Sequence, residues 1–175
     1  MSLTRIARRF LATGALAVTA ALALSGCGAI TAGNDASASD GGFQLADYIQ
    51  KRVDDGEPLR IKLSYHDPSL AFATPISAGM DRAGEELGAD VQLIGPTGGD
   101  AAKQVSELQT LIQQQSVDAL AVSSSSSDAL KPVIAQAYDA GIPIISFNTD
   151  NPGSQQMGFV GQDLKASGQA ESEEL

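Results

Sequence analysis

Short apolar runs and longer amphipathic stretches alternate along most of the chain. The apolar runs cover residues 59–65, 90–95, 118–123 and 142–147, which are lengths typical of β-strands. The run at 142–147 is almost wholly apolar, as expected for a strand that is covered on both faces. The pattern therefore predicts four strands joined by crossovers long enough to hold helices.

The amphipathic stretches are predicted to be helices with recognisable ends. The first begins near Pro75, which suits the first helical position, and ends at Gly88. We expect Asp100 to cap the second helix, and Ser127 and Asp128 to cap the third. The expected buried faces are Ile76, Met80, Ala83 and Leu87, then Ala101, Val105, Leu108 and Ile112, then Leu130, Val133, Ile134, Ala137 and Tyr138.

Two weaker patterns flank these units. Residues 43–53 have apolar positions four apart and predict a helix packed beside the first strand. A short run at 157–161 leads into a helical stretch that begins at Asp163. Together the elements predict an α/β domain, in which a doubly wound parallel sheet is flanked by helices.

The first 26 residues are typical of an export signal. Three arginines precede an apolar run at 10–24, which is too short to span a bilayer permanently. The run ends just before Cys27, the only cysteine, within a segment that resembles the cleavage and acylation site of bacterial lipoproteins. Cys27 is therefore expected to become an acylated N-terminus; an ordinary secretory signal with an incidental thiol is the alternative. The pair Arg8 and Arg9 leaves open whether export uses the Sec or the twin-arginine route.

Composition after the signal predicts a tethered acidic domain. Residues 27–42 are mostly small or polar and are expected to form a flexible tether. Loss of three arginines with the signal would leave 8 of the 11 basic residues against 21 acidic ones, a net charge of −13. Such a charge repels nucleic acids and anionic headgroups, so we expect no nucleic-acid partner and membrane attachment through the acyl chain alone.

Candidate binding groups follow the predicted strands, because ligands of parallel sheets bind beyond the carboxyl ends of the strands. The loops at 65–68, 95–98, 123–127 and 148–151 carry mainly hydroxyl and amide groups, which suit a polyol. Such residues are also ordinary caps and turns. Binding is the preferred interpretation at 148–150, since no helix begins close behind it. The Phe72 ring either stacks on a sugar or packs against the first helix.

The sequence argues against an enzyme. His66 is the only histidine, which excludes a two-histidine zinc site. The chain has no Gly-x-Ser-x-Gly motif, and its glycine-rich segment at 95–103 lacks the Gly-Lys-Ser/Thr of a phosphate loop. The first turn after a strand also lacks the dinucleotide-binding glycines. We therefore expect no catalytic residues, metal site or cofactor.

From Leu59 onward the chain resembles the sugar-type periplasmic binding proteins, which include binders of ribose, rhamnose and related furanoses. The segments that carry the resemblance are Gly95-Pro96-Thr97, Asp100-Ala101-Ala102, Gln104-Val105, Val117 to Leu120, Ser127 to Leu130, Ala140 to Pro143, Phe147 to Asp150 and Phe159 to Asp163. Their order and spacing make the resemblance specific. Some relatives have Asp-Arg where this chain has Asn148-Thr149, so the identity of the sugar is not inherited.

The resemblance implies one lobe of a type I periplasmic binding protein at 43–162, with the start of a second lobe at 163–175. It implies the solute-binding component of an ABC importer, which delivers a monosaccharide-like ligand to a permease at the extracytoplasmic face of the cell membrane. The ligand-binding residues that it implies are Phe72, Asn148 and Asp150, with Ser123 and Ser124 beside them. A chain that ends within the second lobe is expected to be truncated and a poor binder.

Three other interpretations remain open from sequence. The first is a small sugar-modifying enzyme that depends on His66. The second is a sugar-sensing transcriptional regulator, although an export signal stands where its basic helix-turn-helix would be. The third is a one-lobe, membrane-tethered sensor or adaptor.

Overall fold

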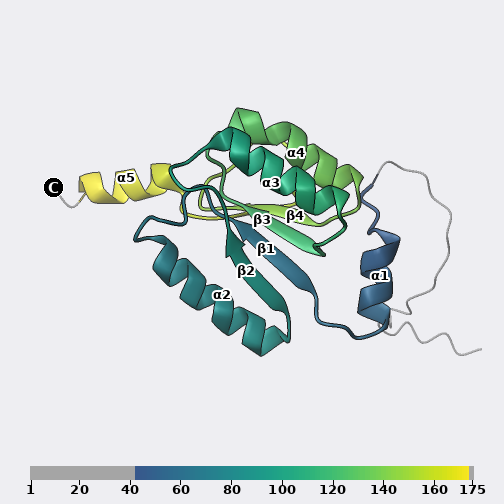
Figure 1. Cartoon of the computed structure of the whole chain (residues 1–175). Helices are drawn as coiled ribbons and strands as arrows, with labels where there is room; N and C mark the ends of the chain where they lie inside the picture. The colour runs from purple at the N-terminus through teal and green to yellow at the C-terminus, as the bar shows by residue number, and fades with distance from the viewer. Residues whose placement is uncertain (1–41, 174–175) are drawn as a thin grey trace, which may run out of the picture. The chain divides into compact units, whose positions relative to one another are not determined.

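The computed structural model describes residues 42–173 as a five-stranded sheet with helices on both faces (Figure 1). The strands are β1 (Arg60–Ser64), β2 (Asp90–Ile94), β3 (Ala119–Val122), β4 (Ile144–Phe147) and β5 (Phe159–Val160). Their order is β2-β1-β3-β4-β5, and every neighbouring pair is parallel. This confirms the predicted doubly wound sheet. The predicted export signal, Cys27 and all of the tether except Gly42 lie outside the described residues.

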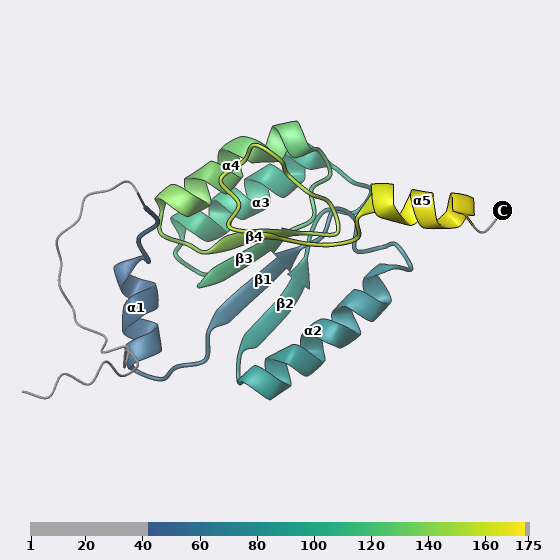
Figure 2. The same ribbon diagram turned by 180° about the vertical axis from the view of Figure 1, so that it is seen from behind.

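Helices cover the two faces unequally. Helix α2 (Ala73–Leu87) lies on one face, while α3 (Ala101–Gln113) and α4 (Ser127–Asp139) lie side by side on the other (Figures 1 and 2). The reversal of strand order after β1 explains this division, because right-handed crossovers in opposite directions place their helices on opposite faces. The two remaining helices are α1 (Asp47–Asp54) and α5 (Leu164–Glu173).

The hydrophobic core lies between the sheet and the α3–α4 layer. Its buried members are Ile49, Leu108, Ile112, Val117, Leu120, Val122, Leu130, Val133, Ile134, Ala137, Ile142 and Ile144. The predicted faces of α3 and α4 supply half of this set, and strands β3 and β4 supply half of the rest. The helical periodicity therefore placed these two helices correctly.

The face that α2 buries differs from the predicted one. Met80 is buried as expected, but Ala83 is exposed and Leu87 is 77% exposed. Gly84 is buried instead, and a Cβ atom built on it would lie 3.1 Å from a Val91 methyl group of β2. Because glycine has no side chain, this face of the helix approaches the strand closely and Leu87 turns outward.

The helix caps were predicted with mixed success. The Asp100 side chain accepts a hydrogen bond from the Lys103 amide at 3.0 Å, which confirms it as the cap of α3. Ser126, rather than Ser127 or Asp128, caps α4 and accepts from the Ala129 amide at 3.4 Å. In a run of five serines, several residues could cap the helix, so composition alone does not identify the capping serine.

Pro75 is the third residue of α2 rather than the first, because the helix begins at Ala73. The first four amides of a helix have no partner within it, so a proline is tolerated at this position too. Gly88 ends the helix in a left-handed conformation with φ of 65°, as predicted.

Helix α1 is shorter than predicted and lies at the amino ends of the strands (Figure 2). The Ala46 amide donates to the Gly141 carbonyl at 3.0 Å, and the Tyr48 hydroxyl donates to the Val117 carbonyl at 2.6 Å. A Cβ on Gly141 would lie 2.5 Å from the Gln44 carbonyl oxygen, so this approach requires glycine. The helix thus packs on the segments that precede β3 and β4, rather than beside β1 as expected.

Helix α5 has no buried residue among those described. Between residues 42 and 173, no helix combines the length and the apolar character that crossing a membrane requires. Within the same range, His, Cys, Asp and Glu side chains do not gather in a group of three or more that could hold a metal ion.

Candidate functional site

The polar side chains at the carboxyl ends of β1, β3 and β4 form one hydrogen-bonded group. His66 Nδ1 lies 2.9 Å from Ser123 Oγ, and Asn148 Nδ2 donates to the same oxygen at 3.0 Å. Thr149 Oγ1 lies 3.3 Å from it. We call His66, Ser123, Asn148 and Thr149 the polar rim. Parallel pairing of the three strands brings these residues together from positions more than 80 residues apart.

Asn148 occupies a backbone position that few residue types tolerate. Its φ is +58°, in the left-handed region where asparagine is favoured over larger side chains. Its backbone amide donates to the Val160 carbonyl of β5 at 2.9 Å, so the residue joins the fourth and fifth strands. The side chain reaches Ser123 while the residue as a whole stays exposed.

Gln104 of α3 supports the rim from below and was not predicted as a site residue. It is fully buried, and its Oε1 accepts from the Ser125 amide and hydroxyl, both at 2.9 Å. Its Nε2 donates at 3.0 Å to Ser64 Oγ and to the Ser123 carbonyl. All the hydrogen-bonding capacity of the amide is used. The available signal was its spacing of four from Leu108, which places a polar side chain on the buried face.

Ser124 is turned into the protein. Its hydroxyl donates to Asn151 Oδ1 at 2.7 Å, and Asn151 Nδ2 donates to Ser146 Oγ at 2.7 Å. Ser124 is 6% exposed and Asn151 is fully buried. This chain of hydrogen bonds ties the loop after β3 to β4, so the Ser124 hydroxyl already has a partner within the fold.

Asp150 is exposed beside the polar rim. Its Oδ1 accepts from Gln156 Nε2 at 2.6 Å, and its backbone carbonyl accepts from the Ser127 hydroxyl at 3.2 Å. With Asn148 it lines a hollow of about 580 Å³, which is bounded on the other side by Phe159 and the start of α5. Asp150 therefore faces the β5–α5 side of the rim.

Phe72 lies at the start of α2 and is 58% exposed. The interpretation that buried its ring against the first helix is therefore wrong. Phe72 shares the carboxyl edge of the sheet with the rim, but among the described residues no hydrogen bond or ring stacking joins it to Ser123 or Asp150. Of the five predicted binding residues, Ser123 and Asn148 are joined by a side-chain hydrogen bond.

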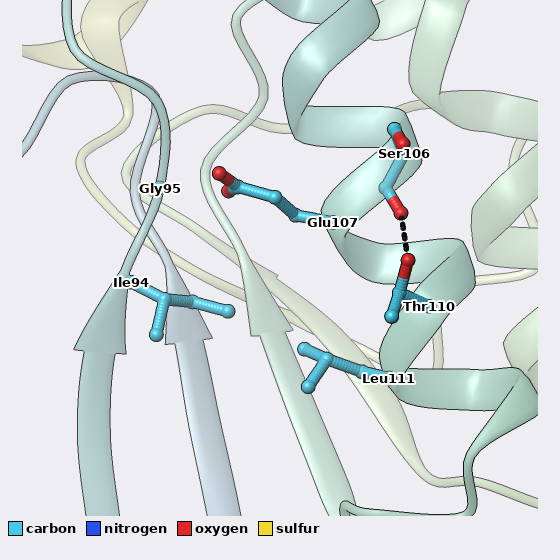
Figure 3. A pocket seen from close by; sticks show the side chains of 6 residues that line it. All are labelled: Ile94, Gly95, Ser106, Glu107, Thr110 and Leu111. Atoms are coloured by element: carbon cyan, nitrogen blue, oxygen red, sulfur yellow. Dashed lines mark hydrogen bonds between the residues drawn. The ribbon is translucent and has the colours of Figure 1, made fainter.

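A second hollow of about 530 Å³ lies between the end of β2 and α3 (Figure 3). Its walls are Ile94, Gly95, Ser106, Glu107, Thr110 and Leu111. The Glu107 side chain extends from α3 toward the strand end, and its Oε2 is buried without a hydrogen-bond partner in the described part of the chain. No residue of the polar rim lines this hollow.

Asp67 places a second carboxylate beside the rim, in addition to Asp150. The Ser69 hydroxyl donates to its Oδ1 at 2.6 Å and the Ser69 amide at 3.0 Å. These hydrogen bonds hold the pKa of Asp67 below its ordinary value, so it is a carboxylate at neutral pH. Burial raises the pKa of Tyr65, which precedes His66 in the chain, so its phenol stays neutral. Two carboxylates, Asp67 and Asp150, among neutral groups suit a hydroxyl-rich ligand better than a phosphate.

Comparison with known proteins gives a consistent family and fold. A family model described as a periplasmic binding protein domain matches residues 61–175. The chain is 28% identical over 152 residues to the xylose/arabinose-binding protein XylF of Sulfolobus acidocaldarius, which covers 81% of this chain and 38% of that protein. It thus spans about two fifths of the length of this curated relative.

Solved structures share the same sheet. The XylFII–LytSN complex matches with a TM-score of 0.62 and 26% identity, covering 67% of this chain and 42% of that one. The ABC transporter solute-binding protein of Burkholderia graminis C4D1M, in complex with D-arabinose, has a TM-score of 0.62 and 21% identity, covering 66% and 39%. The second likeness concerns the fold alone.

Proposed function

Because the chain belongs to the periplasmic binding protein domain family, we propose that it is the solute-binding component of an ABC importer for a monosaccharide-like ligand. The family is one of binding proteins, in agreement with the expectation that the chain is not an enzyme. The observation that carries the proposal is the polar rim, in which side chains from three strand ends meet at one edge of the sheet.

The chemistry of the rim supports a polyol as the ligand. Ser123 and Thr149 offer hydroxyls, Asn148 offers an amide, and His66 offers a ring nitrogen, all within one hydrogen-bonded group. Sugar hydroxyls both donate and accept, so they can replace water on the accessible groups of His66, Asn148 and Thr149, while the buried Ser123 hydroxyl holds these groups together. The exposed Phe72 ring at the same edge is available to the apolar face of a sugar.

The rest of the proposal concerns the export of the chain, its membrane anchor, its lobes and the remaining ligand contacts. Residues 1–26 are proposed to export the chain, the acylated Cys27 to anchor it to the outer face of the membrane, and residues 27–42 to act as a tether. Residues 43–162 would form the first binding lobe, and residues 163–175 would begin a second. Asp150 and Ser124 complete the proposed ligand contacts, Ser124 only after its bond to Asn151 opens. The permease would be the protein partner.

A second candidate is a membrane-tethered sensor or adaptor without a role in transport. One solved structure with this fold is a complex of XylFII with LytSN. A sensor or adaptor of this fold would likewise act by binding a second protein. Uptake of radiolabelled sugar in cells that lack the gene separates the two candidates, because only the importer component is needed for uptake.

Binding can be tested by nuclear magnetic resonance on the full chain. We expect D-xylose, L-arabinose or D-arabinose at millimolar concentration to shift the amide signals of residues 123–127 and 148–150 in a saturable manner. Asn148→Ala should weaken binding about tenfold, because it removes a hydrogen-bonding group that is proposed to contact the ligand. It also removes the hydrogen bond from Asn148 to Ser123 Oγ. Gln113→Ala, an exposed change at the end of α3, is the matched control. Shifts confined to Ile94, Glu107 and Leu111 would place the ligand in the other hollow and contradict the proposal.

A further inference from the structure

His66 is the only histidine of the chain, and it stands where the three strand ends meet. It is partly buried, and its ring lies 4.2 Å from the Tyr65 ring, centroid to centroid. Its Nδ1 is 2.9 Å from the oxygen of Ser123, which is itself fully buried. Imidazole is the side chain that ordinarily changes charge between pH 5 and 8. A change of charge here is transmitted directly to a buried hydroxyl.

The groups around Ser123 Oγ restrict which way its hydrogen can point. A serine hydroxyl has one hydrogen and two lone pairs. Asn148 Nδ2 has no lone pair and must donate to this oxygen, at 3.0 Å. When the Thr149 hydroxyl donates to the second lone pair, across 3.3 Å, the Ser123 hydrogen is left for His66 Nδ1. The imidazole is then neutral, with its hydrogen on Nε2.

Protonation of His66 makes this arrangement impossible. The imidazolium has a hydrogen on both nitrogens, so Nδ1 becomes a donor to Ser123. Three donors would then compete for two lone pairs. The Ser123 hydrogen must turn to Thr149 Oγ1, and the hydrogen of Thr149 must turn away from Ser123. Thr149 therefore changes from a donor to Ser123 into an acceptor from it, and its own hydrogen becomes free to donate elsewhere.

Ionisable groups other than His66 also stand at this edge of the sheet. Asp67 follows it in the chain and is a carboxylate, and Tyr65 precedes it and is a neutral phenol. The loops after β2 and β3 contribute glycines, Pro96, Thr97 and serines, and α3 contributes the neutral Gln104. The loop after β4 carries one carboxylate, Asp150, which is bonded to Gln156.

We propose that His66 is a ligand-contacting residue of the polar rim whose protonation reverses the hydrogen bonds from His66 through Ser123 to Thr149, and so makes sugar binding depend on pH. The inference rests on the proposed sugar-binding function. A neutral sugar that covers an imidazolium removes its water and supplies no opposite charge. Binding should therefore weaken, by about fivefold or more, as the pH falls from 8 to 5.

The first test needs no ligand. Nitrogen-15 spectra of the His66 ring are free of overlap, because the chain has no other histidine. At pH 8 we expect the hydrogen on Nε2 and an Nδ1 signal typical of a hydrogen-bond acceptor, and we expect Ser123→Ala to move that Nδ1 signal. A hydrogen on Nδ1 at pH 8, or an Nδ1 signal unchanged in folded Ser123→Ala, would overturn the proposed reversal.

The second test compares sugar titrations at pH 8 and pH 5 for the wild type and His66→Gln. Glutamine keeps a donor and an acceptor but does not titrate. Its affinity should be lower than that of the wild type at pH 8, because a rim contact is changed, but it should not change between pH 8 and pH 5. Asp67→Asn removes the charge next to His66 but leaves the hydrogen bonds from His66 through Ser123 to Thr149, so this variant should keep the pH dependence of binding. Equal pH dependence in wild type and His66→Gln would refute the inference even though sugar binds. Failure of every sugar at both pH values would refute the proposed function, and the ring spectra would still decide the reversal.

Discussion

The two ends of the sheet bury polar groups in opposite ways. At the amino end, the fully buried Asp118 side chain faces the Arg60 guanidinium at 2.7 Å and Arg52 Nε at 3.2 Å. It also accepts from the Arg60 amide at 2.7 Å. At the carboxyl end, Gln104 and Ser123 are equally buried but make neutral hydrogen bonds only, apart from the contact of Ser123 with His66.

The difference separates a fixed end from an adaptable one. A buried carboxylate without its cations is costly, so the amino end has one acceptable arrangement, which ties α1, β1 and β3 together. Hydroxyl and amide groups can exchange donor and acceptor roles, or exchange a protein partner for a ligand, at little cost. We infer that the amino end stabilises the fold, whereas the carboxyl end is suited to binding.

The largest expected effect is at the amino end. Asp118→Asn should lower the free energy of unfolding by about 3 kcal/mol, because it leaves Arg60 and Arg52 without their shared carboxylate. Urea unfolding followed by circular dichroism measures this loss. Asp128→Asn removes an exposed carboxylate paired with Lys131 and should cost less than about 0.5 kcal/mol. Similar losses in the two variants would remove the contrast between buried and exposed charge.

The next effect is at the carboxyl end. Gln104→Leu should lower the free energy of unfolding by about 2 kcal/mol, since it leaves Ser64, the Ser123 carbonyl and the Ser125 amide without a partner. Gln113→Leu, at an exposed position of the same helix, is the control and should be nearly neutral. If Gln104→Leu proved more damaging than Asp118→Asn, the amino end would not be the more demanding of the two.

The smallest expected effect is a difference in pH dependence between the two ends of the sheet. It concerns the free energy of unfolding, which depends on a carboxylate at Asp118 and on a neutral amide at Gln104. Burial tends to raise the pKa of Asp118, but the hydrogen bonds and charges of Arg60 and the charge of Arg52 outweigh it and lower the pKa below 3.8. Its contribution to stability is therefore complete above pH 3.8 and is lost as the pH falls through the folded value.

The deficit of Asp118→Asn relative to wild type should thus shrink between pH 5 and pH 3, a range in which imidazole no longer titrates. The deficit of Gln104→Leu should stay constant over the same range, because its partners are neutral. Parallel acid profiles for both variants, measured by urea unfolding, would contradict the assignment of the pH dependence to Asp118.

Several errors of the sequence-based interpretation have one origin. Periodicity placed Leu87 on a buried face, but the close approach at Gly84 turns it out. In the sequence, Gln104 is one position within an amphipathic helix, and Ser124 is one of several serines in a row. Neither pattern shows the hydrogen bonds that these residues make. Each depends on which neighbour a side chain meets across the fold. Local spacing can place a residue such as Gln104 on a buried face, but it does not identify the partner.

The sequence by itself determined the parallel α/β architecture, the order of its elements and the helix ends at Gly88 and Asp100, because these follow from hydrophobic period, chain reversals and local hydrogen bonds. It also indicated that neutral polar groups follow the strands. Only the tertiary structure decided that His66, Ser123, Asn148 and Thr149 share one hydrogen-bonded group, while Ser124 turns inward and Phe72 stands apart. Strand register fixes these contacts, because it sets which loop ends meet and which oxygen each donor reaches.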